Sequence, residues 1–191
     1  MRFGDPARSA LLSMDLQQAI VSIYTKDEGG LIRRAAEALR HARTQGLTII
    51  HVQVWFRPNL PEIGTRNPLF SAIKNSAQHR QIFEGAAGAI HPAVAPEGDD
   101  IVVVKHRVNA FVGTDLEMIL RAKNIDTLIV FGIATSGVVL STVLHAADAD
   151  YRLIVIGDCC ADLDSELHAC LVDRVFPRHA TVVSTNQFVE P

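Results

Sequence analysis

Two residues able to do acid–base chemistry stand where apolar segments of the sequence stop. Asp15 follows the apolar residues 10–14, and Lys105 follows the β-branched residues 101–104. Segments of this kind are typical of buried strands, so both side chains are expected at strand ends. Burial raises the pKa of a carboxyl and suits it to proton transfer, whereas a nearby amine opposes that rise. Each residue also has a plain structural interpretation, Asp15 as a helix cap and Lys105 as a surface lysine.

Residues 126–139 predict a strand that changes abruptly into a helix. Residues 128–131 are apolar and end at Gly132, and from Ser136 onward apolar residues recur at helical spacing, with Thr135 or Ser136 placed to cap the first turn. A strand end joined to a helix start brings backbone NH groups and the positive end of the helix dipole together. The sequence therefore predicts a place that favours an anion, or an oxygen developing negative charge.

Apolar runs and amphipathic segments alternate along the rest of the chain. Their order predicts an α/β fold with one domain spanning residues 1–191, built as three layers (α/β/α) around a doubly wound, six-stranded, mostly parallel, Rossmann-like sheet. In such sheets the ligand lies beyond the carboxyl ends of the strands, where Asp15, Trp55, Lys105, the Gly132 turn and Asp158 are all expected. The strands are expected at residues 10–14, 47–54, 101–104, 128–131, 153–156 and 180–183. The clearest helices are expected at residues 30–45, from a capping box at 114–117, and after 136. A further helix is expected to start at Asp164 or Ser165, with its inward face formed by Leu167, Leu171, Val172 and Val175.

Residues 55–68 are rich in proline and glycine, so we expect a long loop at the end of the second strand. Candidates in this loop for lining a pocket and holding a carboxylate are Trp55, Phe56, Arg57 and Arg66; a solvated loop with one aromatic anchor is the alternative. Residues 69–81 are compatible with a helix, and residues 83–98 look irregular.

Composition narrows the class of protein. The chain has 48% hydrophobic and 20% charged residues and a net charge of -3, so nothing indicates a nucleic-acid partner, and no apolar run is long enough to span a membrane. We expect a cytoplasmic protein acting on a small molecule. The three cysteines have no metal-ligand spacing, and Cys159 and Cys160 are interpreted as buried apolar residues rather than reactive thiols.

Four groups of motifs carry a resemblance to a known family. They are residues 13–17; residues 104–105 with 110–111 and 113–114; residues 132–135; and residues 158–161. In this order they resemble the isochorismatase-like cysteine hydrolases, which include nicotinamidases, N-carbamoylsarcosine amidohydrolases and isochorismatases. The resemblance extends over residues 10–183 and implies a homodimer or larger homo-oligomer. It also implies a triad of Asp15, Lys105 and a cysteine, and the cysteine position is Val138.

A valine has no atom able to attack a carbonyl, so covalent catalysis through residue 138 is excluded. The chain then resembles the isochorismatase branch, which cleaves a vinyl ether without a covalent intermediate; this implies Asp15 as general acid, Lys105 as the positioning charge and water as nucleophile. No carboxylate or histidine occurs in residues 52–57, where the nicotinamidases hold a metal, so neither a metal nor another cofactor is expected.

The resemblance further implies a cis peptide at Ile133–Ala134, with the NH groups of Ala134 and Val138 facing the pocket. The residues expected to bind the substrate are Gln17, Trp55, Arg57, Phe111 and Ser136. Two alternatives stay open: a catalytically silent relative that binds a metabolite or a protein, and thiol chemistry by Cys159 or Cys160. Thr135 and Ser136 are weaker candidates for a nucleophile because neither has an obvious base.

Overall fold

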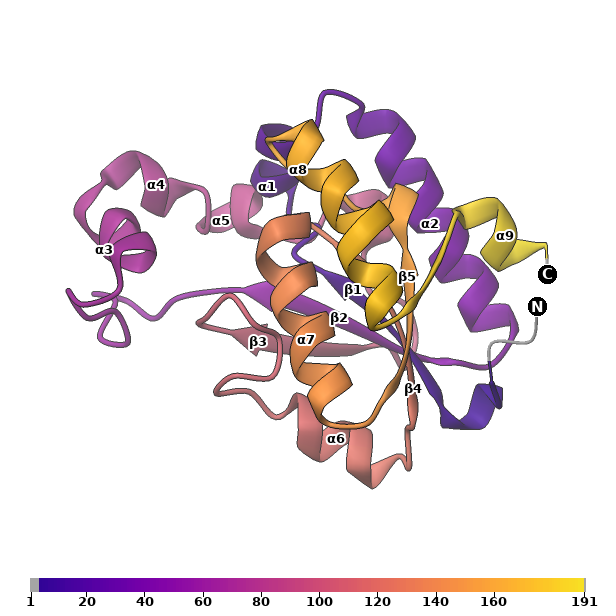
Figure 1. Ribbon diagram of the computed structural model, residues 1–191. Helices are drawn as coiled ribbons and strands as arrows, with labels where there is room; N and C mark the ends of the chain where they lie inside the picture. Colours follow the sequence, from indigo (N-terminus) through magenta and orange to yellow (C-terminus); the bar gives the residue numbers. More distant parts are fainter. Residues whose placement is uncertain (1–3, 191) are drawn as a thin grey trace.

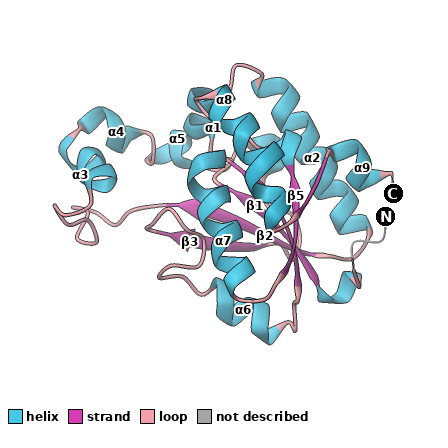
Figure 2. Ribbon diagram, viewed as in Figure 1, coloured by secondary structure: helices cyan, strands magenta, loops and turns pink. Residues whose placement is uncertain are grey.

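The computed structural model describes residues 4–190, and in this part of the chain six strands form a single, entirely parallel sheet. The strand order is β3-β2-β1-β4-β5-β6, and helices cover both faces (Figures 1 and 2). This confirms the three-layer, doubly wound α/β architecture. The strands are β1 (Ser9–Met14), β2 (Thr48–Val54), β3 (Ile101–Lys105), β4 (Thr127–Gly132), β5 (Arg152–Ile156) and β6 (Thr181–Val183).

The two central strands explain the strongest apolar runs in the sequence. Every residue of β1 and β4 is buried, and the strands pair in register from Ser9 opposite Thr127 to Met14 opposite Gly132. Strand β3 lies at the sheet edge, and Val102 and Val104 are exposed there. A strand covered on both faces needs a continuous apolar run, whereas an edge strand does not.

The helices divide between the two faces of the sheet. Helix α2 (Glu28–Thr44) packs against β1 and β2 and lies beside α9 (Thr185–Val189), while α7 (Leu140–Asp148) and α8 (Ser165–Cys170) cover the other face (Figure 1). Asp27 caps α2 by accepting a hydrogen bond from the Gly30 NH, and the apolar stripe of α2 faces the core. In residues 4–190 no helix combines the length and apolarity that a membrane crossing requires.

An arm of three short helices leaves the body between β2 and β3, where it projects on the left of Figure 1. It comprises α3 (Pro68–Asn75), α4 (Ala77–Gln81) and α5 (Gly85–Gly88). The helix expected at residues 69–81 is interrupted at Ser76, which adopts an extended conformation and caps α4. Phe56 joins the arm to the end of β2 through edge-to-face contacts with Phe70 and Phe83.

Three local predictions are wrong. The capping box at residues 114–117 does not form: the Thr114 hydroxyl accepts from the Leu116 NH rather than from the Glu117 NH, and α6 (Leu116–Ala122) starts after Asp115 without a side-chain cap bond. Leu167, expected to face inward, is 41% exposed. The helix after Gly132 begins as a π-helical turn (Thr135–Val139) with Ala134 at its N-cap, and it has no side-chain cap. Helices α1 (Gln18–Tyr24) and α9 complete the fold. Helix α9 was not among the elements expected from the sequence.

Candidate active site

Asp15 and Lys105 meet at the carboxyl edge of the sheet. Asp15 directly follows β1 in a left-handed conformation (φ 56°), and Lys105 ends β3 two strands away. The Asp15 Oδ2 and Lys105 Nζ atoms are 2.7 Å apart, with only 8% and 3% of the two side chains exposed. Gln17, not Asp15, occupies the N-cap of α1. Helix capping and surface exposure therefore do not account for these two residues.

Burial and the neighbouring lysine act in opposite directions on the pKa of Asp15. Burial raises the pKa of the Asp15 carboxyl, and the charge and hydrogen bond of Lys105 oppose the rise without cancelling it. Lys105 Nζ also donates to the Arg107 carbonyl at 3.0 Å. Oδ1 of Asp15 is buried and has no hydrogen-bond partner within residues 4–190. Because Lys105 occupies Oδ2, the acid form of Asp15 carries its proton on Oδ1.

The acid–amine pair lies at a cavity of about 360 Å³. This is near the lower end of the roughly 300–1,000 Å³ usual for small-molecule sites. The peptide Ile133–Ala134 is cis, as expected, and both residues line the cavity beside Val138, which is 2% exposed. Besides Asp15 and Lys105, the wall consists of Ile20, Ile23, Tyr24, Val54, Leu69, Phe70, Ala72, Ile73, His79, Ile82, Phe83, Arg107, Val108, Ile133, Ala134, Gly137 and Val138.

At the turn after β4 the backbone of Gly132 lies very close to the backbone of Met14 in β1. A Cβ atom at Gly132 would lie 2.2 Å from the Met14 carbonyl oxygen, and the φ of +154° also favours glycine. Beyond the turn, the Ser136 NH donates to Asp162 Oδ2 at 2.7 Å, and the Thr135 NH donates to the Ala161 carbonyl. The anion predicted at this helix start is thus a carboxylate of the chain itself.

The residues expected to bind substrate lie outside this cavity. Gln17 is fully buried, and its amide binds both the NH and the carbonyl of Val54 and the Gly88 carbonyl, so it joins β2 to the arm. Phe111 stacks on His145 at 4.4 Å. Trp55 and Arg57 line a separate cavity of about 650 Å³, and Ser136 contributes its NH to Asp162.

The wall of the cavity contains residues that were not expected to bind the substrate. Tyr24 lines the cavity, and burial, reinforced by the neighbouring carboxylates of Asp162 and Asp15, raises the pKa of its hydroxyl. Phe70 and Ile73 of the arm were not singled out from the sequence, although their i, i+3 spacing was a usable signal of an apolar helix face. Arg107, two residues beyond Lys105, was also overlooked.

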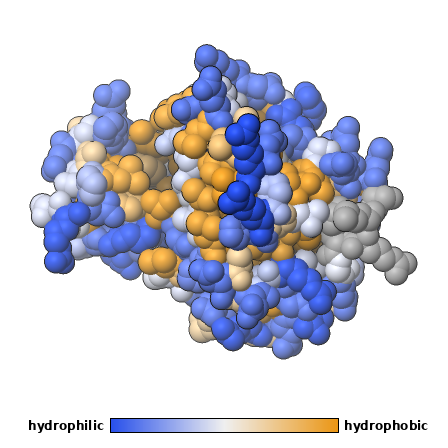
Figure 3. Space-filling view, viewed as in Figure 1, coloured by the Kyte–Doolittle hydropathy of each residue, from blue (hydrophilic) through white to orange (hydrophobic). Residues whose placement is uncertain are grey.

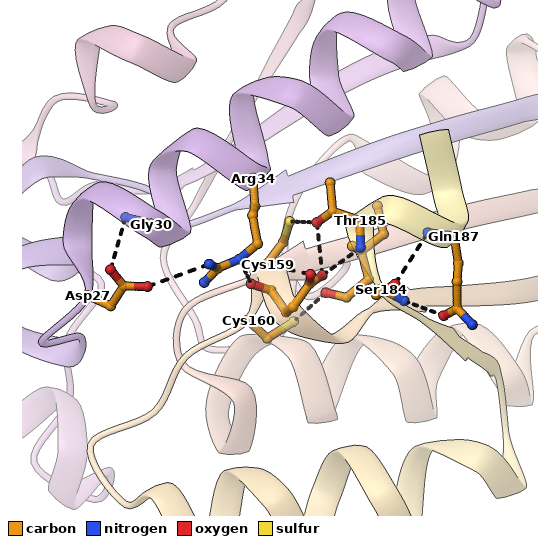
Figure 4. Close-up of polar contacts among 10 residues, drawn as sticks. Asp27, Gly30, Arg34, Cys159, Cys160, Ser184, Thr185 and Gln187 are labelled. Carbon is orange, nitrogen blue, oxygen red and sulfur yellow. Dashed lines mark hydrogen bonds and ion pairs between the residues drawn. The ribbon is translucent and has the colours of Figure 1, made fainter. Parts of the chain in front are cut away.

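The adjacent cysteines belong to a different part of the molecule. Figure 4 shows Cys159 and Cys160 in a network that links α2 to the start of α9. Cys159 Sγ lies 3.2 Å from Thr185 Oγ1, and Asp158 Oδ1 accepts hydrogen bonds from the Thr185 NH and hydroxyl. Burial raises the pKa of both thiols, that of Cys160 to about 12. Such thiols are poor nucleophiles, and Asp158 acts in structure rather than at the cavity.

No three His, Cys, Asp or Glu side chains within residues 4–190 are grouped closely enough to hold a metal ion. His51 and Asp100 form a buried pair, with Nε2 and Oδ2 at 3.1 Å, and Arg43 also binds Asp100. Neither His51 nor Asp100 lines the cavity.

Comparison with known proteins agrees with this fold. The chain is 28% identical over 186 residues to an uncharacterized isochorismatase family protein, YecD, of Escherichia coli O157:H7, covering 95% of this chain and 94% of the relative. It is 26% identical over 192 residues to the maleamate amidohydrolase of Pseudomonas putida, covering 96% and 86%. A solved isochorismatase family structure from Burkholderia thailandensis superposes with a TM-score of 0.82 at 25% identity, covering 97% of each chain. The isochorismatase domain model matches residues 9–187, and the chain therefore belongs to the isochorismatase family of hydrolase-related proteins.

Proposed function

We propose that this protein hydrolyses a small molecule with Asp15 as general acid, Lys105 as the positioning charge and water as the nucleophile. The observation that carries the proposal is the buried Asp15–Lys105 pair, which lines the same cavity as Val138 and leaves Asp15 Oδ1 without a hydrogen-bond partner in residues 4–190. A covalent intermediate at residue 138 has no atom to form on. Membership of a family that contains hydrolases supports the reaction class.

For a vinyl ether, Asp15 and water alone can supply and take back the protons that the reaction needs. Asp15 Oδ1 donates a proton to the terminal carbon of the double bond, which leaves a positive oxocarbenium centre. Water adds to that centre and returns one proton to the Asp15 carboxylate. The resulting hemiketal breaks its C–O bond to release a ketone and an alcohol. Lys105 stabilises the carboxylate form of Asp15 through the 2.7 Å contact.

The test begins with a screen of vinyl ethers and amides, followed by the Asp15→Asn variant on any substrate found. Asparagine keeps the shape of the side chain but cannot deliver the proton, so turnover is expected to fall by about 100-fold or more. Asp173→Asn is the matched control, because it makes the same change at an exposed position outside the cavity. Equal turnover of Asp15→Asn and the unmodified protein would contradict the proposal.

Reaction in D₂O separates the chemical classes. Protonation at carbon places one carbon-bound deuterium next to the product ketone, detectable at early times before slow exchange through the enol, whereas amide hydrolysis places none. A chain that binds metabolites for hours without any product would instead be the catalytically silent relative that Val138 suggested.

We also propose that the protein is a cytoplasmic homo-oligomer, as the resemblance and the composition suggest. Size-exclusion chromatography with light scattering tests the assembly: a mass of 20.8 kDa, that of one chain, would contradict it.

A further inference from the structure

The cavity holds one cation that no acidic group neutralises. Asp15 and Lys105 cancel each other, and the third charged residue of the wall is Arg107. Its guanidinium donates to two neutral acceptors, the carbonyl oxygens of His106 and Glu62, the latter at 2.9 Å. Within residues 4–190 no carboxylate oxygen lies within the 4.0 Å of an ion pair with Arg107. The cavity therefore carries a net positive charge when Lys105 and Asp15 are both ionised.

Glu62 is the acidic residue that Arg107 contacts, but the contact is made by its backbone carbonyl and not by its carboxylate. Although Glu62 accepts from Arg107 through its backbone carbonyl, its side chain accepts from the Arg57 NH at 2.8 Å and lies 3.5 Å from the His106 ring. Burial opposes ionisation of Glu62, yet these hydrogen bonds and charges leave the pKa of its carboxyl below the usual value. Oε1 of Glu62 is thus bound by Arg57 and His106, while Oε2 is buried without a hydrogen-bond partner in residues 4–190 and lies beyond ion-pair distance of Arg107.

Arg107 is held in place before any ligand arrives. Its guanidinium carbon lies 5.5 Å from the centre of the Phe70 ring, and the two carbonyl bonds fix the plane of the group. A guanidinium has five NH donors, and the two carbonyls leave others unused. Preorganised donors of this type suit a carboxylate, which they bind in pairs.

Apart from Tyr24 and His79, the remainder of the wall is apolar. Phe70, Ile73, Ile82 and Phe83 from the arm face Ile20 and Val108 from the body. Figure 3 shows hydrophobic surface around a hollow at the junction of the arm and the body. A ligand that fills this space needs an apolar body of modest size, because the volume is about 360 Å³.

From this charge balance we propose that Arg107 is the specificity-determining residue for a small monocarboxylate whose apolar body lies against the arm. The carboxylate pairs with the guanidinium, and the reacting group of the ligand then lies beside Asp15. This inference rests on the proposed function only in naming that ligand as the substrate; the binding itself does not depend on turnover.

The test compares three probes by NMR titration of the ¹⁵N-labelled protein. Benzoate and benzamide share a ring and a size but differ in charge, and acetate has the charge without the apolar body. A charge-assisted pair is worth about 1.5–3 kcal/mol, so benzoate is expected to bind roughly tenfold or more tightly than benzamide. Benzoate is also expected to bind more tightly than acetate. Equal or tighter binding of benzamide, or no binding of benzoate at its solubility limit, would overturn the proposal; this comparison needs no variant.

Substitution then locates the charge. Arg107→Gln is expected to weaken benzoate about tenfold and to leave benzamide unchanged, and Arg107→Lys is expected to retain part of the benzoate affinity. Arg121→Gln, an exposed arginine on α6, is the matched control. Unchanged benzoate binding by folded Arg107→Gln would also overturn the proposal.

Asp15→Asn separates this inference from the proposed function. The variant is expected to bind benzoate at least as tightly, since it removes a negative charge from the cavity. If Asp15→Asn bound benzoate at least as tightly as the unmodified protein and still turned over substrate, the proposed function would be wrong, but the assignment of Arg107 as the carboxylate-binding residue would hold.

Discussion

Replacing Lys105 by methionine should make the stability of the protein depend on pH through Asp15. The ammonium lies 2.7 Å from Asp15 Oδ2, and both side chains are more than nine-tenths buried. Removing one member of such a pair leaves an uncompensated buried charge, which costs about 3–5 kcal/mol. Asp15 limits this cost by taking up a proton, so its pKa in the folded variant rises further above the usual value of 3.8.

The sign of the pH dependence follows from that rise. A carboxyl whose pKa is higher in the folded state destabilises the fold once the pH exceeds its unfolded value. The free energy of unfolding of Lys105→Met is therefore expected to fall from about pH 4 upward by as much as roughly 1.4 kcal/mol per pH unit, and to level off above the folded pKa.

Urea unfolding at pH 5, 6, 7 and 8 measures this slope. The double variant Asp15→Asn/Lys105→Met is the control, since it lacks the carboxyl but retains every other titrating group. At pH 7 the single variant should be less stable than the double variant by more than 1 kcal/mol, a difference that shrinks toward pH 5. A small difference that does not change with pH would refute the reasoning, because it would mean that the carboxylate is solvated.

Three other predictions concern the turn at Gly132, the buried His51 and the three cysteines. Gly132→Ala should destabilise the protein by several kcal/mol in urea unfolding, because its Cβ would lie 2.2 Å from the Met14 carbonyl; a midpoint equal to that of the unmodified protein would count against the model of this turn. His51 is buried and desolvation lowers its pKa, so stability should decline as the pH falls below the unfolded value of 6.5, and His51→Gln should lose that part of the decline between pH 6.5 and 5; an unchanged slope would exclude His51 as its source. Iodoacetamide should label the exposed Cys170 and spare Cys159 and Cys160 in mass spectra of the folded protein, without loss of any activity found; rapid labelling of all three would show that the two buried thiols are accessible.

The convergence of Asp15 and Lys105 was predictable because it depends on topology. Apolar runs locate the strands, parallel strands end at one edge, and a polar residue after each run must therefore lie there. Neither step needs knowledge of side-chain packing. The single-domain boundary of residues 1–191 and the roles assigned to individual site residues stay predictions.

The wall of the cavity was not predictable in the same way. It depends on where the arm lies relative to the sheet, and contacts between residues far apart in the sequence set that position. Gln17 illustrates this: its amide binds the Gly88 carbonyl, 71 positions away, and is thereby withdrawn from the cavity. Asp162 likewise occupies the Ser136 NH from a loop 26 residues later.

Local motifs failed where a side chain had a competing partner. The Thr114 hydroxyl fits a capping box by spacing, but it accepts from the Leu116 NH at 3.3 Å instead of from the Glu117 NH. Sequence spacing identifies which bonds a residue is able to make, and tertiary structure decides which of them forms.

A titration of the Asp15 carboxyl carbon by ¹³C NMR tests most directly whether the chain holds a proton donor beside its lysine. Burial is expected to place the midpoint above 3.8 in the unmodified protein, and loss of the opposing amine in Lys105→Met should raise it further. A midpoint at or below 3.8, or one that Lys105→Met leaves unchanged, would contradict the account.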